Sequence, residues 1–117
     1  MGKLSTHVLN TMQGVPAQGV QIALYRINGE GRHLLRQALT NRDGRCDEPL
    51  LQGAELQQGI YELVFHAGDY FSAMGVQLAE PRFVDQIGLR FGIADPAENY
   101  HVPLLVTPWA WSTYRGS

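Results

Sequence analysis

The amino-acid sequence predicts an all-β protein built as a two-sheet β-sandwich, and three observations lead to this fold class. Apolar and polar residues alternate along several short segments, which is typical of strands with one buried face. Turn-forming pairs such as Asn28-Gly29 and Asp95-Pro96 separate these segments. No stretch shows a sustained helical period, so about six to eight short strands are expected, and such strands favour a sandwich.

The first clear strand pattern covers residues 20–25, where Val20, Ile22 and Leu24 form one face. The turn signal at residues 28–31 then predicts a hairpin, and a second turn signal follows at residues 41–44. Further strands are expected at residues 33–40, 60–66, 86–93, 100–106 and 109–114.

One segment has a different character. Residues 69–74 begin with Asp69, a good helix N-cap residue, and lead to Gly75, a residue that commonly ends helices. One short helix is therefore expected there, before the strand at residues 86–93.

Composition limits the class of protein. The 117 residues are expected to form a single domain, residues 1–117, and 44% hydrophobic with 17% charged residues is typical of a globular chain. The net charge of -2 does not indicate binding to nucleic acid or to an anionic membrane. Cys46 is the only cysteine, so an internal disulfide is excluded. We therefore expect a cytoplasmic protein, although a periplasmic protein whose leader had been removed would look the same.

Candidate chemistry lies in three polar clusters that are expected outside the strand interiors. In two of them, His7 and His101 could act as general bases, because imidazole accepts a proton near neutral pH. The alternative for each is a surface histidine or a hydrogen-bonded structural one. The clusters cover residues 5–10, 42–45 and 99–105, the last followed by residues 112–117.

Two arginines in these clusters present guanidinium forks suited to a planar, oxygen-rich anion. They are Arg45, after an Asp-Gly turn, and Arg115, near the end of the chain. The alternative for both is a solvated surface arginine. The remaining histidines, His33 and His66, are given no role.

Other catalytic patterns are missing from the sequence. It contains no Gly-x-Ser-x-Gly elbow, no phosphate-binding glycine loop and no Cys-x-x-Cys pair. Cys46 could act as a nucleophile only if the fold brought a histidine close to it. The histidines lack the spacing of zinc ligands, so no metal is expected.

Four motifs stand in the polar clusters: LSTHVL at residues 4–9, DGR at 43–45, YHVPLL at 100–105 and STYRGS at 112–117. Taken together, they resemble the signatures of the 5-hydroxyisourate hydrolases, which are transthyretin-related enzymes. Order and spacing agree, and the resemblance runs over essentially the whole chain. The terminal YRGS is its most specific part.

The resemblance implies an all-β, transthyretin-like (prealbumin-like) fold of two four-stranded sheets with one short helix. It implies hydrolysis of 5-hydroxyisourate to 2-oxo-4-hydroxy-4-carboxy-5-ureidoimidazoline in urate catabolism, with no cofactor. It also implies a homotetramer, a dimer of dimers, whose active sites lie in clefts at the dimer–dimer interface. The only other partner implied is the purine-derived substrate.

Residue by residue, the resemblance implies catalytic roles for His7, Arg45 and His101. One histidine would activate a water, the other would orient it or return a proton, and Arg45 would favour the developing oxyanion. Both histidines are then expected to lie near each other, and the terminal hydroxyl or carboxylate would hold a histidine or the water. The tail motif expected to bind substrate consists of Tyr114, Arg115, Gly116 and Ser117.

Three places depart from the pattern of the resembled family. Asn10 replaces an aspartate found in many members, Asn99 replaces a frequent histidine, and residues 83–88 lack a Phe-Tyr-Pro-like stretch. We expect these departures to affect loop geometry and oligomer packing more than activity.

Two other functions are alternatives to the hydrolase. One is a transthyretin-type carrier of small ligands, and the other is a β-sandwich that serves only as an interaction domain. A carrier has no need of His7, Arg45, His101 and the YRGS tail together, which favours the enzyme.

Overall fold

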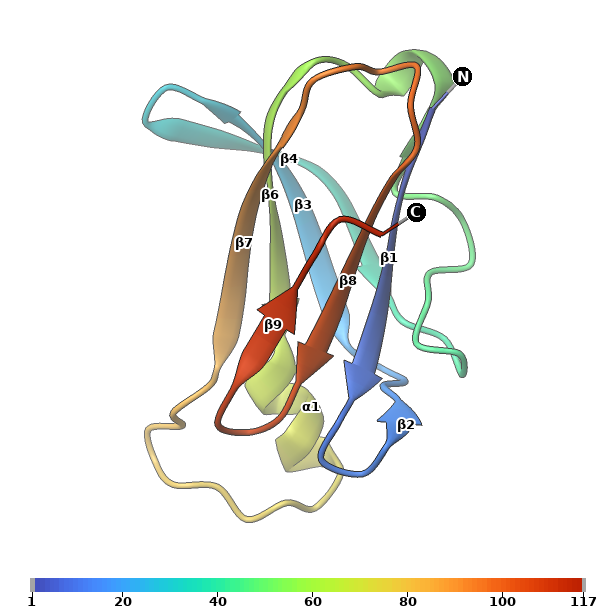
Figure 1. Ribbon diagram of the computed structural model, residues 1–117. Helices are drawn as coiled ribbons and strands as arrows, with labels where there is room; N and C mark the ends of the chain where they lie inside the picture. Colours follow the sequence, from blue (N-terminus) through green and yellow to red (C-terminus); the bar gives the residue numbers. More distant parts are fainter. Residues whose placement is uncertain (1, 117) are drawn as a thin grey trace.

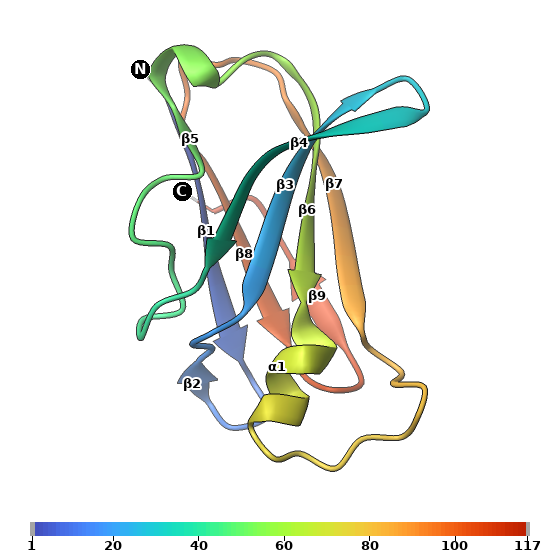
Figure 2. The ribbon, with the colours of Figure 1, turned by 180° about the vertical axis from the view of Figure 1, so that it is seen from behind.

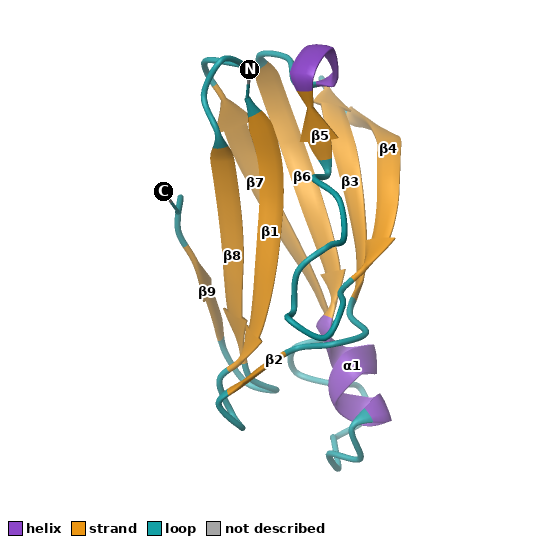
Figure 3. Ribbon diagram, turned by 90° about the vertical axis from the view of Figure 1, so that its right-hand side faces the viewer, coloured by secondary structure: helices purple, strands orange, loops and turns teal. Residues whose placement is uncertain are grey.

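In the computed structural model, which describes residues 2–116, two β-sheets face each other as the layers of a sandwich (Figures 1 and 3). The first, here called the β1–β8 sheet, has the strand order β2-β1-β8-β9, and the short strand β5 pairs with the start of β1. Its strands are β1 (Lys3–Asn10), β2 (Val15–Pro16), β5 (Leu51–Gln52), β8 (Tyr100–Val106) and β9 (Trp111–Thr113).

The second sheet, here called the β3–β6 sheet, has the order β4-β3-β6-β7 and lies toward the viewer in Figure 2. Each sheet contains a run of four hydrogen-bonded strands, and residues 2–116 include one short α-helix. This arrangement confirms the fold class that the alternating segments predict. The elements outside the β1–β8 sheet are β3 (Gln21–Asn28), β4 (Gly31–Leu39), the 3₁₀ turn η1 (Gly53–Glu55), β6 (Gly59–His66), α1 (Ala67–Ala73) and β7 (Gln86–Ile93).

Strands β1 and β8 run parallel to each other, whereas their pairings with β2, β5 and β9 are antiparallel. Leu4 stands opposite Tyr100 at one end of this pair, and Asn10 stands opposite Val106 at the other. Because side chains alternate between the two faces of a strand, the outer-face residues Ser5, His7 and Leu9 of β1 each have an outward-facing neighbour on β8. The two polar clusters at opposite ends of the chain therefore share one surface.

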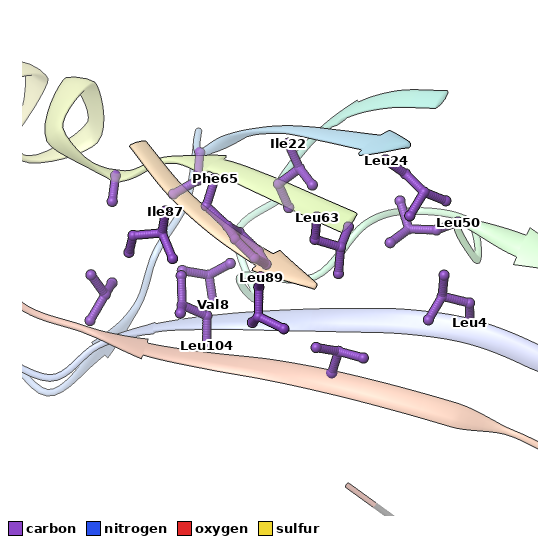
Figure 4. Packing of buried hydrophobic residues seen from close by; sticks show 14 of the residues in the cluster. Leu4, Val8, Ile22, Leu24, Leu50, Leu63, Phe65, Ile87, Leu89 and Leu104 are labelled. Atoms are coloured by element: carbon purple, nitrogen blue, oxygen red, sulfur yellow. The ribbon is translucent and has the colours of Figure 1, made fainter. Parts of the chain in front are cut away.

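The core lies between the sheets, and Figure 4 shows Leu4, Val8 and Leu104 of the β1–β8 sheet opposite Leu63 and Phe65 of the other sheet. These five side chains are fully buried. Burial of each such side chain stabilises the fold by about 1.5–3 kcal/mol. This packing commits alternate residues of β1 and β8 to the interior and directs the intervening residues outward.

The structure corrects the expected location of the first polar cluster. Residues 5–10, assigned above to a polar cluster outside the strand interiors, form most of this central strand. Polar residues obscure its alternation because Thr6 occupies a buried position, where its hydroxyl donates to the carbonyl of Val102 at 2.7 Å. A buried hydroxyl with a partner is tolerated in a core, so the strand forms despite its low apolar content.

The helix begins earlier than its sequence signal indicates. It covers Ala67–Ala73 and follows β6 directly, so His66, and not Asp69, is its N-cap residue. Asp69 lies in the first turn and instead binds Arg82 at 2.6 Å. Burial of Ala67, Tyr70 and Phe71 against the end of the sandwich places the helix. Within residues 2–116, no helix has the length and apolar character needed to cross a membrane.

Candidate functional site

Two histidines from opposite ends of the chain meet on the outer face of the β1–β8 sheet. The ring centroids of His7 on β1 and His101 on β8 are 6.5 Å apart, with the ring planes tilted by 38°. Ser5, which stands opposite His101 in the parallel register, places its Oγ 2.8 Å from His101 Nδ1. This hydrogen bond holds one ring nitrogen and leaves Nε2 as the nitrogen available for proton exchange.

A tight turn at residues 41–45 brings Arg45 beside His7. The side-chain oxygen of Asn41 accepts hydrogen bonds from the backbone N–H groups of Asp43 and Arg45. Gly44 adopts a φ of +75°, and a side chain there would clash with the carbonyl oxygen of Val8. Since Val8 N–H also donates to the Gly44 carbonyl at 2.8 Å, the turn is fixed against β1. The backbones of Arg45 and His7 pair there as an isolated antiparallel β-bridge.

The C-terminal tail continues along β8 after β9 ends (Figure 1). Gly116 N–H donates to the carbonyl of His101 at 2.7 Å. Tyr114 and Arg115 line a separate hollow of about 240 Å³ at the edge of the sandwich, which also includes Leu89. The structure therefore brings His7, Arg45, His101 and Gly116 together and directs Arg115 elsewhere. Ser117 lies outside the described residues.

An open pocket of about 350 Å³ adjoins the histidine pair and has Arg45 and His101 in its wall. Among the residues that the structure describes, no acidic side chain lines it, and Arg45 and Lys3 bring positive charge to it. This lining suits a planar ligand rich in oxygen atoms, because guanidinium and ammonium groups donate to oxygen. The described residues that line it are Lys3, Ser5, Arg45, Asn99, Tyr100 and His101.

The environment lowers the pKa of both histidines below the ordinary value of 6.5. Burial is the largest cause for each, followed by the positive charge of Arg45. His7 further lowers the pKa of His101, whereas hydrogen bonding to the Asp43 backbone and the Asp43 charge partly oppose the shift at His7. Both imidazoles are therefore neutral at pH 7 and able to accept a proton.

Four pocket residues were given no role in the sequence analysis: Lys3, Ser5, Asn99 and Tyr100. Only Lys3 lies outside the polar clusters identified there. Lys3 and Ser5 share an outward face with His7 because they alternate with buried residues on β1. That period of two is the signal that could have identified them, had residues 3–10 been interpreted as a strand. Asn99 precedes β8 and accepts a hydrogen bond from Lys3 N–H at 3.1 Å, so its place depends on the pairing of the two strands.

Asn10, one of the departures from the family pattern, has a structural role at the end of β1. It is completely buried, and its side-chain oxygen accepts from the backbone N–H groups of Met12 and Gln13. Its amide also donates to the hydroxyl of Tyr70 on α1 at 3.1 Å. Asparagine therefore closes the turn after β1 with its own hydrogen bonds.

Neither cysteine chemistry nor a metal centre is apparent in the described part of the chain. Burial, and secondarily the charge of Asp47, raise the pKa of the Cys46 thiol. Cys46 is therefore the protonated thiol at neutral pH, which is a poor nucleophile. Between residues 2 and 116, no three His, Cys, Asp or Glu side chains gather closely enough to hold a metal ion.

A sandwich that presents two neutral imidazoles, a serine and an arginine around one pocket belongs to the class of proteins equipped for acid–base chemistry on an oxygen-rich substrate. Comparison with known proteins identifies the family within this class. Residues 4–116 match the sequence profile described as the HIUase/Transthyretin family. The chain therefore belongs to the HIUase/transthyretin family.

Relatives and solved structures agree with this membership. The 5-hydroxyisourate hydrolase of Pseudomonas aeruginosa is 56% identical over 117 residues, covering 100% of this chain and 93% of the relative. The structure of Klebsiella pneumoniae 5-hydroxyisourate hydrolase superposes with a TM-score of 0.82 at 35% identity, covering 100% of both chains. The structure of an (S)-allantoin synthase gives a TM-score of 0.94 at 46% identity over 99% of this chain, which spans only 44% of that longer chain. These likenesses confirm the transthyretin-like sandwich.

Proposed function

We propose that this chain hydrolyses 5-hydroxyisourate in the pocket beside the histidine pair, through a water activated by one imidazole. The identity of 56% to a 5-hydroxyisourate hydrolase, over 93% of that protein, supports the choice of substrate. The observation that carries the chemistry is the pair of imidazoles 6.5 Å apart, both with a lowered pKa, beside Arg45. Neutral imidazole is the form that can remove a proton from water.

In this mechanism, His7 and His101 divide the acid and base roles. One imidazole accepts a proton from water, and the hydroxide adds to the activated amide carbonyl of the six-membered ring. The carbon–nitrogen ring bond then breaks, and the proton returns to the leaving nitrogen. The product is a carboxylic acid with a ureido group, 2-oxo-4-hydroxy-4-carboxy-5-ureidoimidazoline.

Arg45 has the position and charge to stabilise the intermediate of this reaction. Negative charge develops on the carbonyl oxygen when hydroxide adds, and a fixed guanidinium nearby lowers the energy of that state. Within residues 2–116, no Asp or Glu side chain lines this pocket to neutralise Arg45. We assign Arg45 to the oxyanion, and Lys3 to the binding of other substrate oxygens.

A second copy of the chain completes the site in the proposed homotetramer, a dimer of dimers. The pocket is open to solvent, and the half-buried Leu9 and Leu105 lie farther along the same outer face of β1 and β8. Apolar side chains on the same face as an open polar pocket favour coverage by another protein surface. A cleft between copies would exclude bulk water, which strengthens the effect of Arg45 on the oxyanion.

The decisive test measures the ultraviolet decay of 5-hydroxyisourate generated in situ from urate and uricase. Because the compound also decays spontaneously, acceleration over that background is the quantity measured. We expect the wild-type protein to accelerate decay, and substitution of His7, Arg45 or His101 by alanine to reduce turnover by about a hundredfold or more.

The matched control for the histidine variants is His33→Ala, on the β3–β6 sheet. It removes an imidazole far from the pocket and should retain wild-type turnover. A folded wild-type protein that does not accelerate decay would contradict the proposal and favour the carrier function. Near-normal turnover in all three site variants would contradict the assignment of the site.

A further inference from the structure

The side chain of Arg115 is anchored on three consecutive residues that directly precede His101. Its Nη2 donates to the backbone carbonyl of Asn99 at 3.0 Å and to the carboxylate of Glu98 at 3.2 Å. Its guanidinium carbon lies 4.1 Å from the ring centroid of Tyr100, which is a cation–π contact. One side chain thus ties the C-terminal tail to the beginning of β8.

The anchor point is itself rigid. Tyr100 is 5% exposed, and its hydroxyl accepts hydrogen bonds from the backbone N–H groups of Ala94 and Asp95. The loop before β8 is therefore held from inside the sandwich. A tail residue that binds this loop is attached to an ordered part of the molecule, whereas chain termini without such contacts usually fray.

The next tail residue lies directly against the His101 imidazole. A Cβ atom added to Gly116 would stand 2.8 Å from His101 Cδ2, so the tail backbone is packed on the ring. The Ser5 hydroxyl, 2.8 Å from Nδ1, holds the ring at another atom. The imidazole is therefore confined by β1 and by the tail together.

We infer that Arg115 is a positioning residue, whose contacts with Glu98, Asn99 and Tyr100 keep the tail on His101 and thereby fix that imidazole for catalysis. The inference rests on the proposed function and gives Arg115 a role other than direct substrate binding. Its side chain lines the hollow at the edge of the sandwich, whereas Arg45 lines the pocket.

A substitution at Glu98 can distinguish a positioning role of Arg115 from direct substrate binding. Its side chain is 54% exposed and does not line the pocket, so Glu98→Gln should fold and should leave substrate contacts intact. The experiment measures kcat and KM for Glu98→Gln, Arg115→Ala and the double variant. If Arg115 acts through Glu98, the losses of activity in the two single variants do not add in the double variant. If Arg115 acts on the substrate independently of Glu98, they add.

Arg32 offers a matched control on the opposite sheet. Its guanidinium carbon lies 4.0 Å from the Tyr25 ring centroid, and its Nη1 lies 3.2 Å from the Glu62 carboxylate. Its side chain is 51% exposed, against 53% for Arg115. Arg32→Ala therefore removes the same kind of contact without touching the tail, and its turnover should equal that of the wild type.

We expect Arg115→Ala to lower kcat/KM by roughly tenfold or more, chiefly through kcat, because a misplaced catalytic group slows the chemical step. Glu98→Gln should cause a smaller loss of about threefold, since the other two contacts of Arg115 remain. The double variant should be no slower than Arg115→Ala. Full activity in Glu98→Gln combined with a large loss in Arg115→Ala, or strictly additive losses, would overturn the inference.

Nuclear magnetic resonance titration of the His101 ring tests the same inference without turnover. The charged and hydrogen-bonding groups around this ring are Ser5, His7, Lys3 and Arg45. Loss of the tail from the ring would reduce burial, which is the largest cause of the lowered pKa, so the pKa of His101 should rise in Arg115→Ala and stay unchanged in Arg32→Ala.

An unchanged His101 titration in Arg115→Ala would overturn the inference. Failure of the wild-type protein to hydrolyse 5-hydroxyisourate would contradict the proposed function instead, and the titration would still decide whether Arg115 holds the tail on the ring.

Discussion

Ser5 shows how much the site depends on a single hydroxyl. It is the partner of His101 Nδ1 at 2.8 Å, and it alternates with buried residues on a strand held by the core. The strand therefore places this hydroxyl, and the hydroxyl selects the orientation of the ring. Without that partner, the imidazole would keep the packing of the tail at Gly116 but lose the hydrogen bond that orients Nδ1.

We expect Ser5→Ala to lower kcat by about tenfold while the protein remains folded, because the imidazole loses the bond that orients it. Ser5→Thr retains the hydroxyl and should recover part of the activity. Ser72→Ala, an exposed serine of α1, is the control. Equal activity of the Ser5→Ala and Ser72→Ala variants would remove Ser5 from the site.

The lowered pKa values of His7 and His101 predict the pH dependence of turnover. An imidazole that must accept a proton is inactive once protonated, so kcat/KM should fall on the acid side with a midpoint below 6.5. A pH–rate profile between pH 4 and 8, roughly the range in which histidines titrate, measures this midpoint. A midpoint above 6.5 would contradict the prediction that burial and the Arg45 charge lower the pKa of the catalytic histidine.

The same shifts predict a change in stability with pH. Because the folded pKa values lie below 6.5, the unfolded chain binds more protons between the folded and unfolded values. The stabilising contribution of the two neutral histidines is present above pH 6.5 and is lost as the pH falls through the folded pKa values. In urea unfolding, His101→Gln should therefore lose less stability than the wild type on acidification.

At the scale of the element, the turn at residues 41–45 determines where Arg45 lies. Gly44→Ala should destabilise the protein by about 2–4 kcal/mol, because a left-handed backbone and a clash with the Val8 carbonyl add together. Gly19→Ala is the matched control, since Gly19 also has a positive φ of +86° but has open space around it. It should cost only about 1 kcal/mol.

Chemical denaturation compares the two glycine variants, and the 5-hydroxyisourate assay shows whether Arg45 has moved. Gly44→Ala should reduce turnover, whereas Gly19→Ala should not. Equal stability losses in both variants would show that the turn yields around the added methyl group.

At the scale of the whole molecule, the proposed tetramer covers the outer face of the β1–β8 sheet. Leu105→Glu places a charge on that face and should shift the protein toward smaller assemblies in native mass spectrometry, with reduced turnover. Leu39, 58% exposed on the β3–β6 sheet, offers the control Leu39→Glu. A tetramer that forms equally well with Leu105→Glu would place the interface elsewhere.

Local patterns in the sequence were sufficient for much of this fold. Alternation identified the strands observed as β3 (Gln21–Asn28) and β7 (Gln86–Ile93), and turn residues marked the hairpin between β3 and β4. The same alternation was obscured in β1, where site residues occupy the outer face and Thr6 occupies a buried position. A strand that carries function lacks the polar–apolar contrast that makes strands recognisable.

The sequence by itself determined the strand periodicity, the turns and the motifs that carry the family resemblance, because each of these depends on residues close together in the chain. Only the tertiary structure decided that β1 lies parallel to β8, which places Ser5 beside His101 and Lys3 beside Asn99. It also decided that Arg115 binds the loop before β8 while Arg45 lines the pocket. Pairing between distant strands follows from burying two apolar faces at once, and local periodicity carries no information about it.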